Sequence, residues 1–178
     1  MQEAVIHSER IFQGRVVNLR VDTIRLPNGK LSQREIVEHR GAVAIVPLLD
    51  DETTLMIKQF RLAVNEVLLE VPAGTLEPGE PPEECAHREL EEETGYRAGT
   101  LQRLFSQYLA PGYSQEILHV FLARDLQPTA QRTEEDENVE VVPMPIHRAV
   151  EMVLAGEIKD AKTIAALLVT HYILTNRR

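Results

Sequence analysis

The stretch GTLEPGEPPEECAHRELEEETGY, residues 74–96, predicts a short helix with an unusual charge distribution. Pro81 suits the first turn, where the missing proline N–H is not needed. Ala86 and Leu90 lie one turn apart and give the helix an apolar face. Gly95 suits a left-handed cap that ends it. The pattern predicts a helix from the proline pair at 81 and 82 to this glycine.

The last turn of this helix is crowded with carboxylates, at Glu89, Glu91, Glu92 and Glu93. A helix C-terminus carries partial negative charge, and like charges three or four residues apart repel, so the arrangement is unfavourable by itself. Glu89, Glu92 and Glu93 share one side of the helix. Hard divalent cations take oxygen ligands, so a bound metal would offset the repulsion. We therefore interpret the cluster as a metal site, with a solvated acidic face as the alternative.

The chain before this stretch is rich in β-strand signals, and residues 3–39 are predicted to be strands. Alternating β-branched residues run from 15 to 26 and end in Pro27-Asn28-Gly29, and a second run returns over residues 30–39. Asn-Gly between two such runs predicts a hairpin whose two turn residues both have positive φ.

The remaining elements alternate between strands and helices. An almost wholly apolar run at 41–49 is typical of a strand buried on both faces. The other predicted elements are strands at 54–61, 100–110, 115–126 and 139–146, an acidic loop at 127–138, and helices near 146–155 and 161–175. The segment EVLLEVPAG, residues 66–74, leads into the predicted helix stretch. Most spacers between strands are too short for helical crossovers, so the pattern predicts an α+β fold with antiparallel or mixed sheets.

Composition sets limits on function. The chain has 178 residues, 43% hydrophobic and 26% charged, which is typical of one soluble globular domain. A net charge of −9 argues against a general nucleic-acid binder, although a divalent metal would still allow a phosphate-bearing substrate. The lone Cys85 excludes an internal disulfide, and the longest apolar run, residues 164–169, is too short for a membrane span. The N-terminus lacks a basic start and an apolar run, so we expect a cytoplasmic protein.

Residues 74–96 resemble the signature of the Nudix hydrolase family: Gly, five residues, Glu, seven residues, then Arg-Glu-apolar-any-Glu-Glu-any-Gly-apolar. We call residues 74–96 the signature stretch. The matching positions are Gly74, Glu80, Arg88, Glu89, Leu90, Glu92, Glu93, Gly95 and Tyr96. The departure is Tyr96, where the family usually has Ile, Leu or Val. The resemblance implies an α/β/α sandwich with a mixed sheet over residues 41–178. It also implies hydrolysis, dependent on Mg²⁺ or Mn²⁺, of a nucleoside diphosphate linked to another moiety.

The same resemblance assigns roles to the signature residues. It implies that Glu89, Glu93 and the main-chain carbonyl of Ala73 are metal ligands. Glu92 would be a further ligand or a neighbouring acid, and Arg88 would hold the glutamates by ion pairs. Metals at such sites neutralise a diphosphate, orient it and activate water.

A second segment suggests the substrate. Pro111 lies fifteen residues beyond Tyr96, in LAPGYSQE, and this spacing resembles the ADP-ribose pyrophosphatase subfamily, with Ala110 in place of its usual serine. By this resemblance Pro111 and Gly112 contact substrate, and Glu116 adds to the metal or ribose site. The alternative interpretation is an ordinary Pro-Gly turn.

Other segments are similar to the same subfamily. Arg61 in KQFR and Glu70 in EVPAG would contact the substrate, Arg61 at phosphate. Arg34 in REIVEH would reach the adenine or ribose region, often from the partner subunit of a domain-swapped homodimer. Residues 1–40 would then form an N-terminal β region for dimerisation and substrate contacts. Both arginines could instead be sheet-surface charges.

The acidic loop supplies the last candidates. Related enzymes deliver a glutamate from such a loop, as metal ligand or general base, and Glu135 is the first candidate here and Glu137 the second. A loop without function is the alternative.

The implied reaction is hydrolysis of ADP-ribose to AMP and ribose 5-phosphate. The alternatives are hydrolysis of another sugar nucleotide such as GDP-mannose or ADP-glucose, cleavage of oxidised nucleoside triphosphates, or a non-catalytic nucleotide sensor. We expect neither a nucleic-acid nor a membrane partner.

Overall fold

The computed structural model describes residues 2–133 and 138–176, and the chain divides into two compact units. The N-terminal unit comprises Met1–Gly41 and Gln107–Ile117, and the main unit comprises Ala42–Ser106 and Leu118–Arg178. The domain boundary that the sequence suggested after residue 40 stays a prediction.

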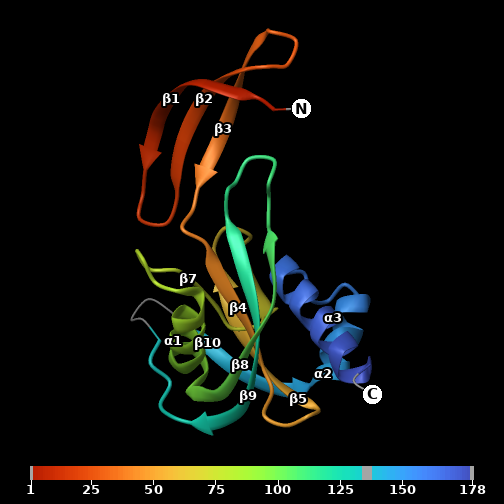
Figure 1. Cartoon of the computed structure of the whole chain (residues 1–178). Helices are drawn as coiled ribbons and strands as arrows, with labels where there is room; N and C mark the ends of the chain where they lie inside the picture. Colours follow the sequence, from red (N-terminus) through yellow and green to blue (C-terminus); the bar gives the residue numbers. More distant parts are fainter. Residues whose placement is uncertain (1, 134–137, 177–178) are drawn as a thin grey trace. The chain divides into compact units, whose positions relative to one another are not determined.

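The N-terminal unit contains an antiparallel sheet with strand order β1-β2-β3, drawn in red to orange in Figure 1. Its strands are β1 (Ala4–Gln13), β2 (Asn18–Arg25) and β3 (Leu31–Glu38). The predicted hairpin joins β2 to β3, but its turn differs from the expectation. Only Gly29 has a positive φ, of 83°, and its N–H donates to the Leu26 carbonyl at 2.8 Å. Pro27 fixes a negative φ early in the turn, so the left-handed residue comes last.

Segment 107–117 is tied to β3 by main-chain hydrogen bonds. The Val37 N–H donates to the Tyr113 carbonyl at 2.7 Å, and the Gln115 N–H donates to the Val37 carbonyl at 3.1 Å. The chain turns at Pro111, where the Ala110 carbonyl accepts from the Tyr113 N–H at 3.1 Å. The PGYS turn expected from the sequence is therefore present.

The main unit contains two sheets. The four-stranded sheet has the order β7 (Ala73–Thr75), β4 (Ala42–Pro47), β9 (Ile117–Pro128), β8 (Tyr96–Tyr108), and the three-stranded sheet has the order β10 (Val139–Pro145), β5 (Thr53–Arg61), β6 (Glu66–Glu70). Strands β4 and β9 are parallel, while β4 and β7 are antiparallel. The sheet is mixed, as predicted.

Strand β4 is buried on both faces, and helices cover each face (Figure 1). Val43 and Ile45 pack in one apolar cluster with Leu90 of α1 (Pro82–Thr94). Ala44 and Val46 pack in a second cluster with α2 (Ile146–Leu154) and α3 (Ala161–Asn176). The main unit is therefore the α/β/α sandwich that the resemblance implied. No helix within the described ranges is both long and apolar enough to span a bilayer.

Helix α1 begins and ends where the sequence predicted. Pro81 stands at its N-cap, and Gly95 ends it with φ 72° and an N–H that donates to the Glu91 carbonyl. The chain after β9 caps the same end from outside. The Arg132 N–H donates to the Glu92 carbonyl at 3.0 Å, and the Gln131 side chain donates to the Glu93 carbonyl at 2.8 Å. These contacts satisfy carbonyls that a helix end leaves open.

Candidate active site

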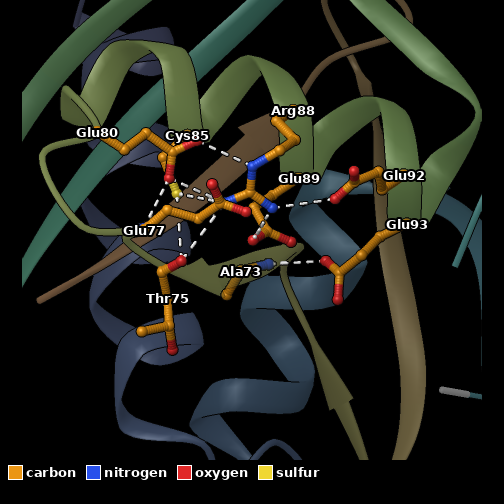
Figure 2. A network of polar contacts seen from close by, with 9 residues as sticks. All are labelled: Ala73, Thr75, Glu77, Glu80, Cys85, Arg88, Glu89, Glu92 and Glu93. Atoms are coloured by element: carbon orange, nitrogen blue, oxygen red, sulfur yellow. Dashed lines mark hydrogen bonds and ion pairs between the residues drawn. The ribbon is translucent and has the colours of Figure 1, made fainter. Parts of the chain in front are cut away.

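The guanidinium of Arg88 organises the signature stretch (Figure 2). Its Nη1 donates to Glu89 at 2.7 Å and to Glu92 at 3.0 Å. Its Nε and Nη2 donate to the two carboxylate oxygens of Glu80, at 2.9 and 3.0 Å. One cation thus meets three carboxylates, and the cluster keeps an excess of negative charge. The ion pairs implied for Arg88 by the family resemblance are present.

Gly74 lies directly against the carboxylate of Glu89. A Cβ built on residue 74 would overlap the carboxyl carbon and both oxygens of that side chain. The glycine that opens the signature stretch is therefore needed for close approach between β7 and α1, since any larger residue would displace Glu89. The Glu89 side chain is only 13% exposed in this position.

Glu93 is buried at 2% exposure, and it accepts a hydrogen bond from the Ala73 N–H at 2.8 Å. This contact joins the last turn of α1 to the start of β7. The sequence pointed to the Ala73 carbonyl, and the group of Ala73 that the structure places on Glu93 is its N–H. The four predicted residues nevertheless lie in one cluster, which comprises Ala73, Glu89, Glu92 and Glu93 (Figure 2).

Arginine side chains of the protein partly offset the repulsion at the acidic end of α1. Glu91 accepts two hydrogen bonds from Arg97, at 3.2 and 3.0 Å, while Arg88 forms ion pairs with Glu89 and Glu92. The repulsion that the sequence assigned to a metal is therefore already reduced by side-chain cations. The surplus of carboxylates over these cations leaves charge that a divalent ion would neutralise.

The donor set suits a hard cation, because its side-chain groups are carboxylate oxygens. Within residues 2–133 and 138–176, no three His, Cys, Asp or Glu side chains are arranged to hold a metal ion. The contacts explain this: Arg88 bonds both Glu89 and Glu92, and Glu93 accepts from the main chain. A cation would have to replace part of the Arg88 contact. The chemistry of the residues fits a metal.

Electrostatics in the cluster follow from the Arg88 contacts. Hydrogen bonding from Arg88 holds the pKa of Glu80 at about 2, below its ordinary 4.5. The same hydrogen bond is the first cause that raises the pKa of Arg88 above its ordinary value. Burial raises the pKa of the Cys85 thiol, so this side chain is a packing residue, as the sequence indicated.

A second charged cluster joins β5, β6 and α3. Arg61 donates two hydrogen bonds to Glu70, both 2.8 Å long, and Lys162 of α3 also donates to Glu70. Burial acts to raise the pKa of Glu70, but the hydrogen bonds from Arg61 and the charge of Lys162 lower it below its ordinary value. The hydrogen bonds to Glu70 are the first cause that raises the pKa of Arg61, and the charge of Glu93 adds to it.

The other predicted substrate residues lie in the N-terminal unit. Arg34 pairs with Glu3 at 2.6 Å, and an oxygen of Glu116 lies 3.9 Å from Nδ1 of His39. Pro111 borders a hollow of about 370 Å³ whose other lining residues are Arg20, Ile36, Tyr108, Tyr113, Ser114 and Gln115. The neighbouring Gly112 has open space where a Cβ would stand. Glu135 and Glu137, the loop candidates, lie outside the described residues.

Sequence reasoning missed Lys162 and Thr163 at the start of α3. Asp160 accepts from the Thr163 N–H at 3.0 Å, which is an N-cap contact that the letters DAKT could have indicated. The Thr163 hydroxyl accepts a hydrogen bond from the Val71 N–H at 2.9 Å and donates one to Asp160 at 2.6 Å. The contact between Val71 and Thr163 is long-range and links α3 to the chain just after β6. No local sequence pattern predicts it.

An α/β/α sandwich with a carboxylate cluster on α1 is the arrangement that the resemblance implied for a hydrolase of nucleoside diphosphate derivatives. Comparison with known families agrees with this class. Residues 38–167 match the NUDIX domain, and residues 3–37 match the nucleoside diphosphate sugar hydrolase N-terminal domain. The chain belongs to the Nudix hydrolase family.

Individual relatives give the same result. The chain is 46% identical to the ADP-ribose pyrophosphatase of Bacillus subtilis (strain 168), over 94% of this chain and 91% of that protein. It is 34% identical to the GDP-mannose pyrophosphatase of Salmonella arizonae, over 96% of each. A solved structure described as an ADP compounds hydrolase matches with a TM-score of 0.87 and 25% identity, over 99% of this chain and 96% of that one.

Proposed function

We propose that this protein hydrolyses the diphosphate bond of ADP-ribose to give AMP and ribose 5-phosphate, with Mg²⁺, or Mn²⁺ in its place, as cofactor. The observation that carries the proposal is the 46% identity to an ADP-ribose pyrophosphatase along nearly the whole chain. The signature stretch, which departs from the family pattern only at Tyr96, and the Pro111 segment support it.

The metal would be held by Glu89 and Glu93, with the Ala73 carbonyl and Glu92 as further oxygen donors. When bound, it would neutralise the diphosphate and lower the pKa of a coordinated water. Glu135 remains the first candidate for an additional ligand or general base, and Glu137 the second.

The chain's own residues have separable tasks in this proposal. Arg88 keeps the glutamates oriented, because its fork binds three carboxylates at once. Arg61 binds a phosphate group, for which its planar guanidinium is suited. Arg34, Glu70, Pro111, Gly112 and Glu116 complete the expected contacts to substrate.

The reaction balances as the addition of one water to the diphosphate. The water oxygen forms a bond to one phosphorus, and the bond from that phosphorus to the bridging oxygen breaks. The bridging oxygen leaves with the other phosphate, and the proton lost by the water passes to a carboxylate base. A glutamate is suited to this role if it lies within about 2.6–3.2 Å of that water.

GDP-mannose is a second candidate substrate, favoured by the 34% identity to a GDP-mannose pyrophosphatase over nearly the whole chain. ADP-glucose would use the same chemistry. The signature stretch acts on the diphosphate in each case, so the mechanism stands whichever sugar nucleotide is preferred.

A homodimer, with the N-terminal strands exchanged between subunits, is part of the proposal. Its support is the match of residues 3–37 to an N-terminal domain of this enzyme class and the exposed apolar side chains of β1, at Val5, Ile6, Ile11 and Phe12. Sedimentation at micromolar concentration tests it, and a monomer would reject it. A cytoplasmic location also remains a proposal.

The activity is tested by a substrate panel with Mg²⁺, comprising ADP-ribose, GDP-mannose, ADP-glucose, NADH and 8-oxo-dGTP. Released mononucleotide is measured with and without a chelator. We expect chelator-sensitive release of AMP, with ADP-ribose turned over fastest. Fastest cleavage of another sugar nucleotide would overturn the substrate assignment and leave the mechanism in place, whereas absence of turnover across the panel would contradict the proposed function.

A further inference from the structure

Glu70 is a buried carboxylate with two cationic partners. It ends strand β6 at 1% exposure, and Arg61 and Lys162 both donate to it. A buried carboxylate needs a counter-charge, because removal of its partner leaves an uncompensated charge in the protein interior. One cation would meet that need here. The second cation can therefore leave Glu70 without leaving that carboxylate uncompensated in the protein interior.

The two cations differ in how firmly they are held. The Arg61 side chain is 38% exposed and Glu70 is its hydrogen-bonded partner, through two bonds. The Lys162 side chain is 13% exposed and also donates to Asp160 at 3.0 Å. Asp160 in turn caps the start of α3. Lys162 is therefore the fixed partner, and Arg61 is the partner with room to turn.

The backbone around Glu70 is anchored to the same helix. The Val71 N–H donates to the Thr163 hydroxyl at 2.9 Å, and Thr163 is fully buried. Two residues later, the Ala73 N–H donates to Glu93. The start of α3, the end of β6 and the last turn of α1 thus form one connected framework, so Lys162 is positioned with respect to the signature carboxylates.

An arginine fork binds a carboxylate and a phosphate with the same bidentate geometry. Arg61 is therefore able to exchange Glu70 for a phosphate group without a change in its own chemistry. Resting on the function proposed above, we propose that Lys162 is a positioning residue that neutralises Glu70 while Arg61 turns from Glu70 to the substrate diphosphate.

The test compares Lys162→Gln and Lys162→Arg with Lys159→Gln. Lys159 is a matched control, because it pairs with Glu66 in a contact whose side chains are 59% and 49% exposed. For Lys162→Gln we expect KM for ADP-ribose to rise about ten-fold with kcat changed less than about three-fold, since the loss is in ground-state binding. Lys162→Arg should restore most of the affinity, and Lys159→Gln should match the wild type.

A double-mutant cycle separates this role from general support of the fold. When Glu70 is already Gln, no buried charge is left to neutralise, so the further change Lys162→Gln should alter KM by less than about two-fold. An equal rise in KM in both backgrounds would overturn the proposal. So would a fall in kcat and melting temperature at unchanged KM. If Lys162→Gln alone does not fold, recovery of folding in the double variant with Glu70→Gln supports the charge argument, and failure of both contradicts it.

Inorganic pyrophosphate distinguishes this inference from the proposed activity. With Mg²⁺ present, pyrophosphate should raise the melting temperature of the wild type and of Lys159→Gln, and raise that of Lys162→Gln much less. This readout needs no turnover. If the wild type does not hydrolyse ADP-ribose but shows this pattern of melting temperatures, the substrate assignment is rejected and the role of Lys162 stands. Equal shifts in melting temperature in all three proteins would reject that role.

Discussion

Gly74 and Glu89 lie in direct contact, with the glutamate carboxylate in the space where a side chain on residue 74 would begin. The glycine belongs to β7, which pairs antiparallel with the central strand β4, and the glutamate belongs to α1. The contact therefore fixes the separation between strand and helix at the candidate metal site. It also gives a physical reason for glycine at the first position of the signature stretch.

Gly74→Ala should displace the Glu89 carboxylate and leave the fold in place. The overlapping atoms are the far end of a flexible side chain, so we expect the free energy of unfolding to change by about 1 kcal/mol or less. Turnover should fall about 100-fold or more, because an electrostatic group of the site is moved. Steady-state kinetics and urea denaturation measure the two effects.

The control for this variant is Gly156→Ala, which lies after α2 at φ 74° with open space around its Cβ position. Alanine in that conformation should cost about 1 kcal/mol of stability and leave kcat unchanged. Full activity in Gly74→Ala would contradict the importance of the contact.

Arg88→Lys should destabilise the protein most when metal is removed. Lysine cannot reproduce the fork that serves Glu80, Glu89 and Glu92, so carboxylates are left without a partner. We expect a loss of about 1–3 kcal/mol in the free energy of unfolding in chelator, partly recovered with Mg²⁺. Arg97→Lys, at an exposed pair with Glu91, should change stability by about 0.5 kcal/mol or less. Equal effects of the two substitutions in chelator would show that Arg88 has no special role.

The Glu80–Arg88 pair should make stability depend on pH in a defined window. Because the folded pKa of Glu80, about 2, lies below the ordinary 4.5, its contribution is fully present above pH 4.5 and is lost as pH falls toward 2. The difference in unfolding free energy between wild type and Glu80→Gln should therefore be largest at neutral pH and shrink below about 4.5. Urea titrations in chelator at several pH values measure it, and a constant difference would rule the pair out as its cause.

The sequence was sufficient to predict the elements of the signature stretch because local signals specify them. Pro81 and Gly95 mark the ends of α1, and the apolar run of β4 indicates a strand buried on both faces. The hairpin turn was predicted in kind, but its φ values were not, since Pro27 imposes a different start on the turn. Composition and spacing therefore predicted the type of each of these elements better than the φ values of the turn residues.

The charged contacts were harder to predict because their partners are far apart in the chain. Arg61 and Glu70 were each expected to meet substrate, and the structure pairs them with each other. Lys162 lies 92 positions beyond its partner, so no periodicity connects the two. Likewise, the capping of α1 by Gln131 depends on how the chain returns after β9.

Cys85 should be unreactive in the folded protein. Its side chain lies on the buried face of α1, and burial raises the pKa of its thiol, so the thiolate needed for reaction is scarce. A thiol-specific reagent such as DTNB should label it only on unfolding, at a rate that follows the urea transition. Rapid labelling under native conditions would mean that α1 opens from the sheet.

Glu93→Gln should separate catalysis from folding. The amide oxygen of glutamine can still accept from the Ala73 N–H, so the link between α1 and β7 is preserved. The negative charge is lost, which weakens metal binding and should lower kcat about 100-fold or more. The melting temperature in chelator should stay level or rise, because one repulsive charge at the helix end is removed.

The matched control is Glu151→Gln, an exposed residue of α2 paired with Arg148, which should retain wild-type kinetics. Mn²⁺ titration by calorimetry gives an independent readout: affinity should fall in Glu93→Gln and not in the control. Because Glu93 is 2% exposed and bonded to the main chain, activity within a few-fold of wild type would mean that its carboxylate serves the fold and that the metal site lies elsewhere.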